Sequence, residues 1–181
     1  MDTYKLKFTR LQMEIFRLLC IKAGERLNQS QIARFLKVSP TAVAKALPSL
    51  QKEGLAIIDE SKEMNLTLIR LNRDSQKAML FKRAENLKII YEAGLQEFLE
   101  ENFPGTAIIL FGSYSRGDDT SKSDIDIAII GGKDKKMDLT AFEKKAERKI
   151  VINFYGSFKA IKKELQENIC NGIVLAGGIA L

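Results

Sequence analysis

The order of periodic segments predicts an α+β protein with two parts. Residues 9–50 hold three segments whose apolar residues recur at helical spacing, and short β-type runs follow at 55–58 and 66–71. After residue 105, strand-like and helical segments alternate, which is typical of a small mixed sheet covered by helices. We therefore expect three helices and a β-hairpin first, and then a small α/β domain.

The composition is that of an ordinary globular protein, and it removes several kinds of chemistry. Hydrophobic residues make up 45% of the 181 positions and charged residues 29%, a balance that can bury a core. The sequence has no histidine, which removes the commonest general base and most zinc sites. No apolar run reaches the roughly 18 residues of a membrane helix, and the first residues lack an apolar signal region. We expect a cytoplasmic protein.

The positive charge is concentrated in the first part of the chain. Residues 1–75 contain 13 Lys and Arg against 8 Asp and Glu, whereas residues 76–181 contain 16 against 15. A basic excess favours a polyanionic partner for the first part, although a plain solvated surface can have the same composition.

Capping residues predict where the three N-terminal helices begin. Thr9 is placed to cap the first helix, and the second follows residues 28–30, Asn28 to Ser30. Ser39 with Pro40 begins the third, because the first position of a helix needs no amide donor. Pro48 stands within that helix, where its ring clashes with the preceding turn, so we expect a kink or an early end there.

Three helices followed by a hairpin is the order of a winged helix-turn-helix, and residues 9–71 resemble the small winged-helix transcription regulators. The resemblance implies that the third helix enters the major groove of double-stranded DNA and that the hairpin forms a wing. The DNA contacts expected on this basis are Gln29, Ser30, Ser39, Thr41, Lys45 and Lys62. The alternative is a three-helix packing unit that binds a protein.

The segment between the two parts is rich in helix formers, and we expect a linking helix over 76–101. Its apolar residues recur at helical spacing and are Ala84, Leu87, Tyr91, Leu95 and Phe98. This stripe could face the core of the second domain or join two copies of the chain in a homodimer. The expected domains are thus 1–75 and 102–181, on either side of this helix.

The second domain is expected to contain three strands, with a glycine-containing loop between the first two. The expected elements are strands at 106–111, 124–130 and 149–155 and helices near 139–148 and 158–170. Side chains alternate between the two faces of a strand, so Asp124 and Asp126 should point to one side while Ile125 and Ile127 point into the core.

The two aspartates and the glycine loop together predict a phosphate and metal site. Neighbouring carboxylates repel each other, and a divalent cation relieves that repulsion. Mg²⁺ in particular is held by one or two carboxylates together with substrate phosphates. Gly112 lets the backbone approach a phosphate, Ser113 adds a hydroxyl, and Arg116 can neutralise phosphate charge.

The motif Gly112-Ser113, ten residues and then Asp124-Ile125-Asp126 resembles the DNA polymerase β-type nucleotidyltransferases, most closely their minimal branch. The resemblance covers roughly 90–181. It implies that Gly112 and Ser113 hold a nucleoside triphosphate and that the aspartates hold two Mg²⁺ (or Mn²⁺). A nucleoside monophosphate would then pass to a hydroxyl acceptor, such as that of a protein, with release of pyrophosphate.

Active relatives commonly carry a third carboxylate on a later strand, but the matching strand at 149–155 has no Asp or Glu. Asn153 is the nearest polar residue, and its amide can ligate a metal but is a poor base. Asp134, Asp138 or Glu147 could substitute if their segment folds back. Two functions stay open: an enzyme that nucleotidylates a hydroxyl, and a DNA-binding regulator whose second domain only senses nucleotide.

Overall fold

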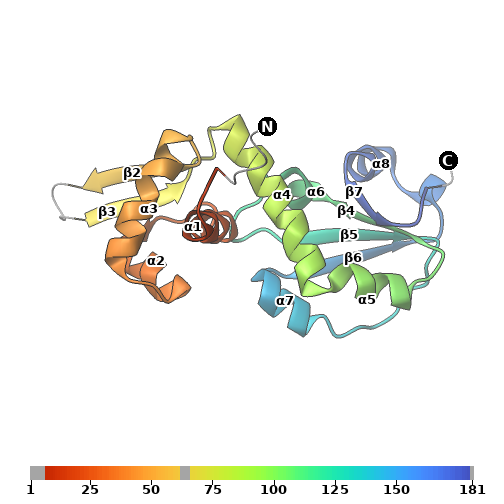
Figure 1. Ribbon diagram of the computed structural model, residues 1–181. Helices are drawn as coiled ribbons and strands as arrows, with labels where there is room; N and C mark the ends of the chain where they lie inside the picture. Colours follow the sequence, from red (N-terminus) through yellow and green to blue (C-terminus); the bar gives the residue numbers. More distant parts are fainter. Residues whose placement is uncertain (1–6, 62–65, 180–181) are drawn as a thin grey trace, which may run out of the picture. The chain divides into compact units, whose positions relative to one another are not determined.

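The computed structural model describes residues 7–61 and 66–179. The chain divides into two compact units, residues 1–82 and 83–181, and the division falls within helix α4 (Gln76–Ala93) (Figure 1). Within the described ranges, no helix combines the length and apolar character needed to cross a membrane.

Three helices of the first unit begin at the residues that the sequence offers as caps. Reciprocal hydrogen bonds of a capping box start α1 at Thr9 and α2 at Asn28, and the Ser39 hydroxyl accepts a hydrogen bond at the start of α3. The helices are α1 (Arg10–Ile21), α2 (Gln29–Leu36) and α3 (Pro40–Lys52).

The early end predicted at Pro48 does not occur, because α3 continues to Lys52. Proline has no amide N–H, so the carbonyl of Ala44 loses its intrahelical donor. Because Pro48 is exposed, water can donate a hydrogen bond to that carbonyl instead. The opposite side of α3 is buried, with Val43 and Leu50 fully inaccessible in the core of the first unit.

A three-stranded antiparallel sheet completes the first unit and gives it the winged-helix fold. The two predicted strands are β2 (Ala56–Ser61) and β3 (Leu66–Leu71), which pair with each other. A further strand, β1 (Leu27–Asn28), pairs with β3 and was not predicted, since two residues are too few to display a period. This pairing brings the beginning of α2 beside the hairpin.

Two helices replace the single helix predicted over 76–101. Gly94, with a φ of 78°, ends α4 and precedes α5 (Leu95–Asn102). The predicted apolar stripe is wrong in part, since Ala84 and Tyr91 are exposed whereas the adjacent pair Ile89 and Ile90 is buried. Apolar residues occur on both sides of this helix, so their spacing alone could not identify the buried side.

The second unit is built on a four-stranded mixed sheet with the order β6-β5-β4-β7. β4 is antiparallel to β5 and β7, and β5 is parallel to β6. β7 was not predicted. The strands are β4 (Ala107–Phe111), β5 (Ile125–Ile130), β6 (Ile150–Tyr155) and β7 (Ile173–Ala176). The other elements are α6 (Gly112–Arg116), α7 (Thr140–Ala146), the 3-10 helix η1 (Phe158–Ala160) and α8 (Lys163–Cys170).

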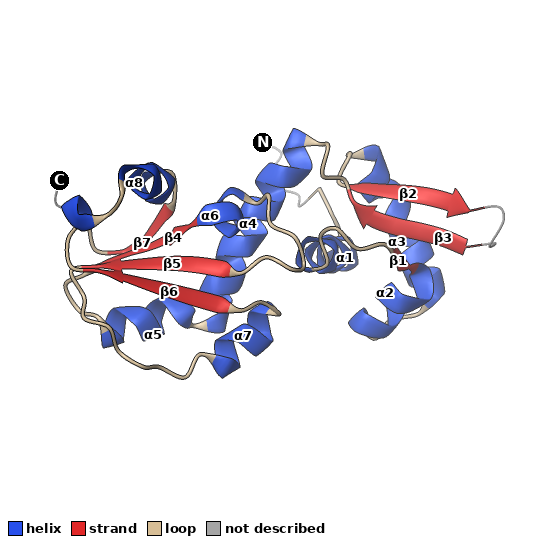
Figure 2. Ribbon diagram, turned by 180° about the vertical axis from the view of Figure 1, so that it is seen from behind, coloured by secondary structure: helices blue, strands red, loops and turns tan. Residues whose placement is uncertain are grey.

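Helices cover both faces of this sheet, with α8 on one face and α5 and α7 on the other (Figure 2). Ile125 and Ile127 are fully inaccessible, as predicted. Ala128 and Ile130 alternate with them and pack in the cluster that includes Ile169 of α8. The face of β5 that carries the aspartates is therefore also buried along most of the strand. The prediction that this face is polar holds only at the beginning of β5.

Candidate functional site

The glycine of the predicted loop lies directly against the second aspartate. Gly112 has a φ of 74°, and a Cβ atom added to it would lie 2.7 Å from Oδ2 of Asp126. Phe111, the last residue of β4, stands opposite Asp126 in the antiparallel register. The residue that follows the strand therefore meets the carboxylate, and the two halves of the motif come together.

The two aspartates form a pair of like charges at the beginning of β5. Burial raises the pKa of Asp126, and the neighbouring carboxylate of Asp124 raises it further. A divalent cation would relieve this repulsion, and carboxylate oxygens are the donors that Mg²⁺ and Mn²⁺ prefer. Asp124 is exposed and Asp126 half-buried, so the pair could hold such an ion, whose other ligands would come from solvent or from a bound molecule.

The short helix α6 carries the remaining predicted phosphate contacts. Ser113 is half-buried, and the buried hydroxyl of Ser115 donates to the Gly112 carbonyl at 2.9 Å, which tightens the turn. Arg116 is exposed, with Nε donating to Asp118 at 3.2 Å and Nη1 donating to Asn168 at 3.1 Å. Its charge is thus partly matched by Asp118, and a phosphate would compete with that partner.

A buried network of polar side chains contacts the segment that contains α6 and the residues after it. The side-chain amide of Asn86, on α4, donates to the Tyr114 carbonyl at 2.8 Å and to Oδ1 of Asp119 at 2.6 Å. Oδ2 of Asp119 lies 3.6 Å from the guanidinium of Arg148. All three side chains come from separate segments and are buried. The sequence did not predict this network, because no local spacing connects its members.

A cavity of about 410 Å³ opens beside Asp124, at the beginning of β5 and β6. Its lining includes Lys122, Lys149 and two carboxylate residues, Glu143 and Glu147. Glu147 was one of the predicted substitutes for a third carboxylate, and the structure places it around the same cavity as Asp124.

The other two predicted substitutes are exposed residues of the segment before α7. Hydrogen bonds from the Thr140 side chain and amide lower the pKa of Asp138, so Asp138 serves the beginning of that helix. Asp134 is not among the residues that line the cavity beside Asp124.

Asn153 does not stand beside the aspartates. The parallel register places Val151 opposite Asp126 and Asn153 opposite Ala128. Asn153 therefore shares the face of Asp126 but lies two residues further along the strand than the partner of Asp126. Among the residues that the structure describes, no group of three His, Cys, Asp or Glu side chains is placed to hold a metal ion.

The expected DNA contacts of α3 lie on the exposed surface of the winged-helix unit. Ser39, Thr41 and Lys45 are exposed, and Lys52 continues the same side of the helix toward its end. Lys62, expected in the wing, falls outside the described residues.

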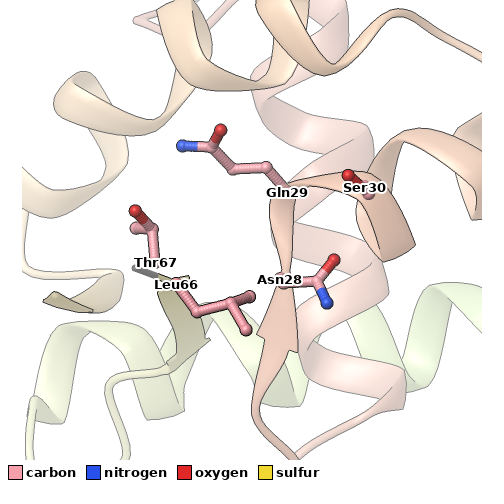
Figure 3. Close-up of a pocket in the computed structure, with 5 residues that line it drawn as sticks. All are labelled: Asn28, Gln29, Ser30, Leu66 and Thr67. Atoms are coloured by element: carbon pink, nitrogen blue, oxygen red, sulfur yellow. The ribbon is translucent and has the colours of Figure 1, made fainter. Parts of the chain in front are cut away.

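Gln29 and Ser30 lie at the beginning of α2, beside the hairpin. Together with Asn28, Leu66 and Thr67 they line a cavity of about 260 Å³. Figure 3 shows the side chains of Gln29 and Thr67 extending toward the same space from the two elements. The pairing of β1 with β3 positions them, and the sequence did not predict it.

Residues 93–174 match the family described as nucleotidyltransferase domain. That range contains the glycine loop, both aspartates and β6, so the part of the second unit that holds the predicted site is similar to nucleotidyltransferase domains. No curated protein matches the chain.

The solved structures similar to this chain include proteins of Streptococcus pyogenes and Lactococcus lactis. The adhesin competence repressor AdcR of Streptococcus pyogenes is 23% identical, with a TM-score of 0.42 over 54% of this chain and 69% of AdcR. A mutant of Lactococcus lactis ZitR, solved in complex with DNA, is 25% identical, with a TM-score of 0.42 over 57% of this chain and 68% of ZitR. ZitR is described as a zinc-responsive member of the MarR family.

Proposed function

We propose that the chain is a DNA-binding protein whose nucleotidyltransferase-type domain binds a nucleoside triphosphate together with Mg²⁺. The observation that carries this proposal is the contact of Gly112 with Asp126, beside Asp124. A backbone without a side chain approaches the Asp126 carboxylate, which lies beside that of Asp124, so a phosphate and its cation can occupy adjacent positions there.

The residues around this contact supply the remaining interactions of the proposed site. Backbone amides after Gly112 and the Ser113 hydroxyl would donate hydrogen bonds to phosphate oxygens. Asp124 and Asp126 would hold the cation, which neutralises charge on the phosphates. If a hydroxyl acceptor enters, its oxygen would bond to the α-phosphorus while the bond to the pyrophosphate group breaks.

Calorimetric titration of the full chain with each common nucleoside triphosphate, with and without Mg²⁺, tests the proposal. The natural protein should bind at least one of them in a Mg²⁺-dependent way, and the double variant Asp124→Asn with Asp126→Asn should lose that binding. A matched control is Asp134→Asn with Glu164→Gln, which removes two exposed charges elsewhere in the same unit. Equal affinity in both double variants would contradict the site.

A second proposal concerns the first unit, which we infer to bind double-stranded DNA. The exposed row of Thr41, Lys45 and Lys52 on α3 supports it, as does the cavity between α2 and the hairpin. Titration of a labelled random duplex with the full chain at low salt is the test. If no duplex is bound while the chain retains a protein from a cell lysate, the unit is a protein-docking module instead.

A further inference from the structure

The two strands beside Asp126 offer it apolar neighbours. Phe111 stands opposite Asp126 on β4, and Val151 stands opposite it on β6. Phe111 is buried, whereas Val151 is 38% exposed on the edge strand of the sheet. Asp126 therefore has no charged or oxygen-bearing side chain at either lateral position.

Val151 belongs to the same face of the sheet as the aspartate. Partners in a parallel register project to the same side, and residues two apart on one strand share a face. Tyr155, two such steps beyond Val151, packs against the cluster beneath α8, which is the face that Asp126 occupies. An oxygen ligand on β6 would have to be at position 151 to reach the ion held by Asp126.

The chemistry of phosphoryl transfer requires more than this pair of carboxylates. One Mg²⁺ can be held by one or two carboxylates, phosphate oxygens and water. A second ion that binds the attacking oxygen requires additional ligands, and removing a proton from a hydroxyl requires a base. Asp124 and Asp126 are sufficient to hold one ion. A valine side chain can neither bind a second ion nor remove a proton from a hydroxyl.

Two other carboxylates lie around the cavity beside Asp124, and one of them has a structural role. Oε1 of Glu143 accepts a hydrogen bond from the Ile150 amide at 3.0 Å and so serves the beginning of β6. Glu147 lines the cavity beside Asp124. Neither forms a three-carboxylate group with the aspartates among the residues described.

We propose that Val151 makes this domain a one-cation site that holds a nucleoside triphosphate without transferring its monophosphate. This inference rests on the proposed nucleotide binding and specifies its consequence. The bound triphosphate is a reversible ligand, which suits a domain attached to a DNA-binding unit, and not a substrate that is consumed.

Counting bound Mn²⁺ tests the proposal. The full chain would be saturated with an α,β-methylene nucleoside triphosphate, which cannot be cleaved between those phosphates, and free Mn²⁺ would be measured by electron paramagnetic resonance. The natural protein should bind one ion together with the nucleotide, and Val151→Asp should bind two. Asn153→Asp places the same charge two residues further along β6. Val174→Asp places it on the opposite edge strand, where Val174 is 51% exposed. Both controls should bind one ion.

Pyrophosphate release from natural triphosphates gives a second readout, with water as the acceptor. The water oxygen bonds to the α-phosphorus, its proton passes to the carboxylate, and pyrophosphate leaves. Val151→Asp should raise this release roughly 100-fold, the scale of a positioned general base. The natural protein and the two control variants should release little pyrophosphate.

The possible results distinguish a failure of both proposals from a failure of this inference alone. A natural protein that binds neither nucleotide nor Mn²⁺ contradicts the proposed function and this inference with it. Nucleotide bound with two ions, and rapid pyrophosphate release, contradicts this inference alone; loss of both in Glu147→Gln would then identify the third carboxylate. If a folded Val151→Asp, checked by circular dichroism, still binds one ion, Val151 is not the missing position. The count for the natural protein needs no variant to fold.

Discussion

At Gly112 a left-handed backbone conformation coincides with close contact to the Asp126 carboxylate. An alanine there would adopt a left-handed φ and place its Cβ against Asp126. We expect Gly112→Ala to lose about 1–2 kcal/mol of unfolding free energy and to abolish nucleotide binding. Gly105→Ala is the matched control, because Gly105 has a φ of 76° but open space around it. It should lose comparable stability and bind normally. Equal binding by the two variants would contradict the role of the contact.

Asn86 is expected to support the loop through its two hydrogen bonds. Asn86→Ala leaves the Tyr114 carbonyl and Asp119 with one buried donor fewer, which should cost roughly 1–3 kcal/mol. Because Tyr114 lies on α6, nucleotide affinity should fall as well. Asn102→Ala removes a similar amide-to-carbonyl bond of 2.8 Å outside the loop and should leave affinity unchanged. If Asn86→Ala also keeps full affinity, the network only stabilises the fold.

At the scale of single residues, the sequence predicted those site residues that lie close together in the chain. Gly112 and the two aspartates are close in the chain, and the contact between Gly112 and Asp126 joins strands that follow one another in sequence. Val151 and Asn86 could not be found in the same way. Val151 stands beside Asp126 only because of the register between β5 and β6. Asn86 contacts Asp119, which is far from it in the sequence.

Helices α3 and α4 are connected by one carboxylate. Glu53, just after α3, accepts hydrogen bonds from Lys7, at 2.7 Å, and from Lys77 of α4. These hydrogen bonds lower the pKa of Glu53 from 4.5 to about 2. The folded-state pKa is the lower one, so the stabilisation is complete above pH 4.5 and is lost as the pH falls through about 2.

Thermal unfolding as a function of pH tests this connection. Glu53→Gln should lower the unfolding temperature at neutral pH, and the difference from the natural protein should vanish toward pH 2. Glu14→Gln breaks an exposed pair with Arg10 within one helix and should have little effect. If the difference in unfolding temperature between Glu53→Gln and the natural protein persists near pH 2, the effect is due to packing and not to the charge of Glu53.

Whole elements were predicted well where a cap or a long period defines them. Thr9 and Ser39 begin their helices as expected, and the second helix begins within the expected residues 28–30, with Asn28 as its cap. β1 and β7 were missed because short strands have no readable period, and the sheet order depends on pairing that is non-local. The buried side of α4 was misjudged because polar residues such as Asn86 are buried there among apolar ones.

For the molecule as a whole, DNA affinity should depend steeply on salt. Each phosphate contact contributes a slope of about −0.9 in log affinity against log salt concentration. If Lys45 contacts phosphate, Lys45→Ala should reduce the magnitude of the slope by about 1. Lys159→Ala, an exposed lysine of the second unit, is the control and should leave the slope unchanged. Gel-shift titrations at several salt concentrations measure both, and identical slopes would remove Lys45 from the interface.

The proposed nucleotide site is tested most directly by nuclear magnetic resonance with a paramagnetic ion. Mn²⁺ broadens amide signals near it, so a ¹⁵N-labelled full chain with a nucleoside triphosphate reports where the ion binds. We predict that small additions of Mn²⁺ broaden the amides of residues 112–117 and 124–126 first, and that Asp124→Asn with Asp126→Asn abolishes the effect. Broadening centred on any other part of the second unit, or broadening that is unchanged in the double variant, would contradict the site.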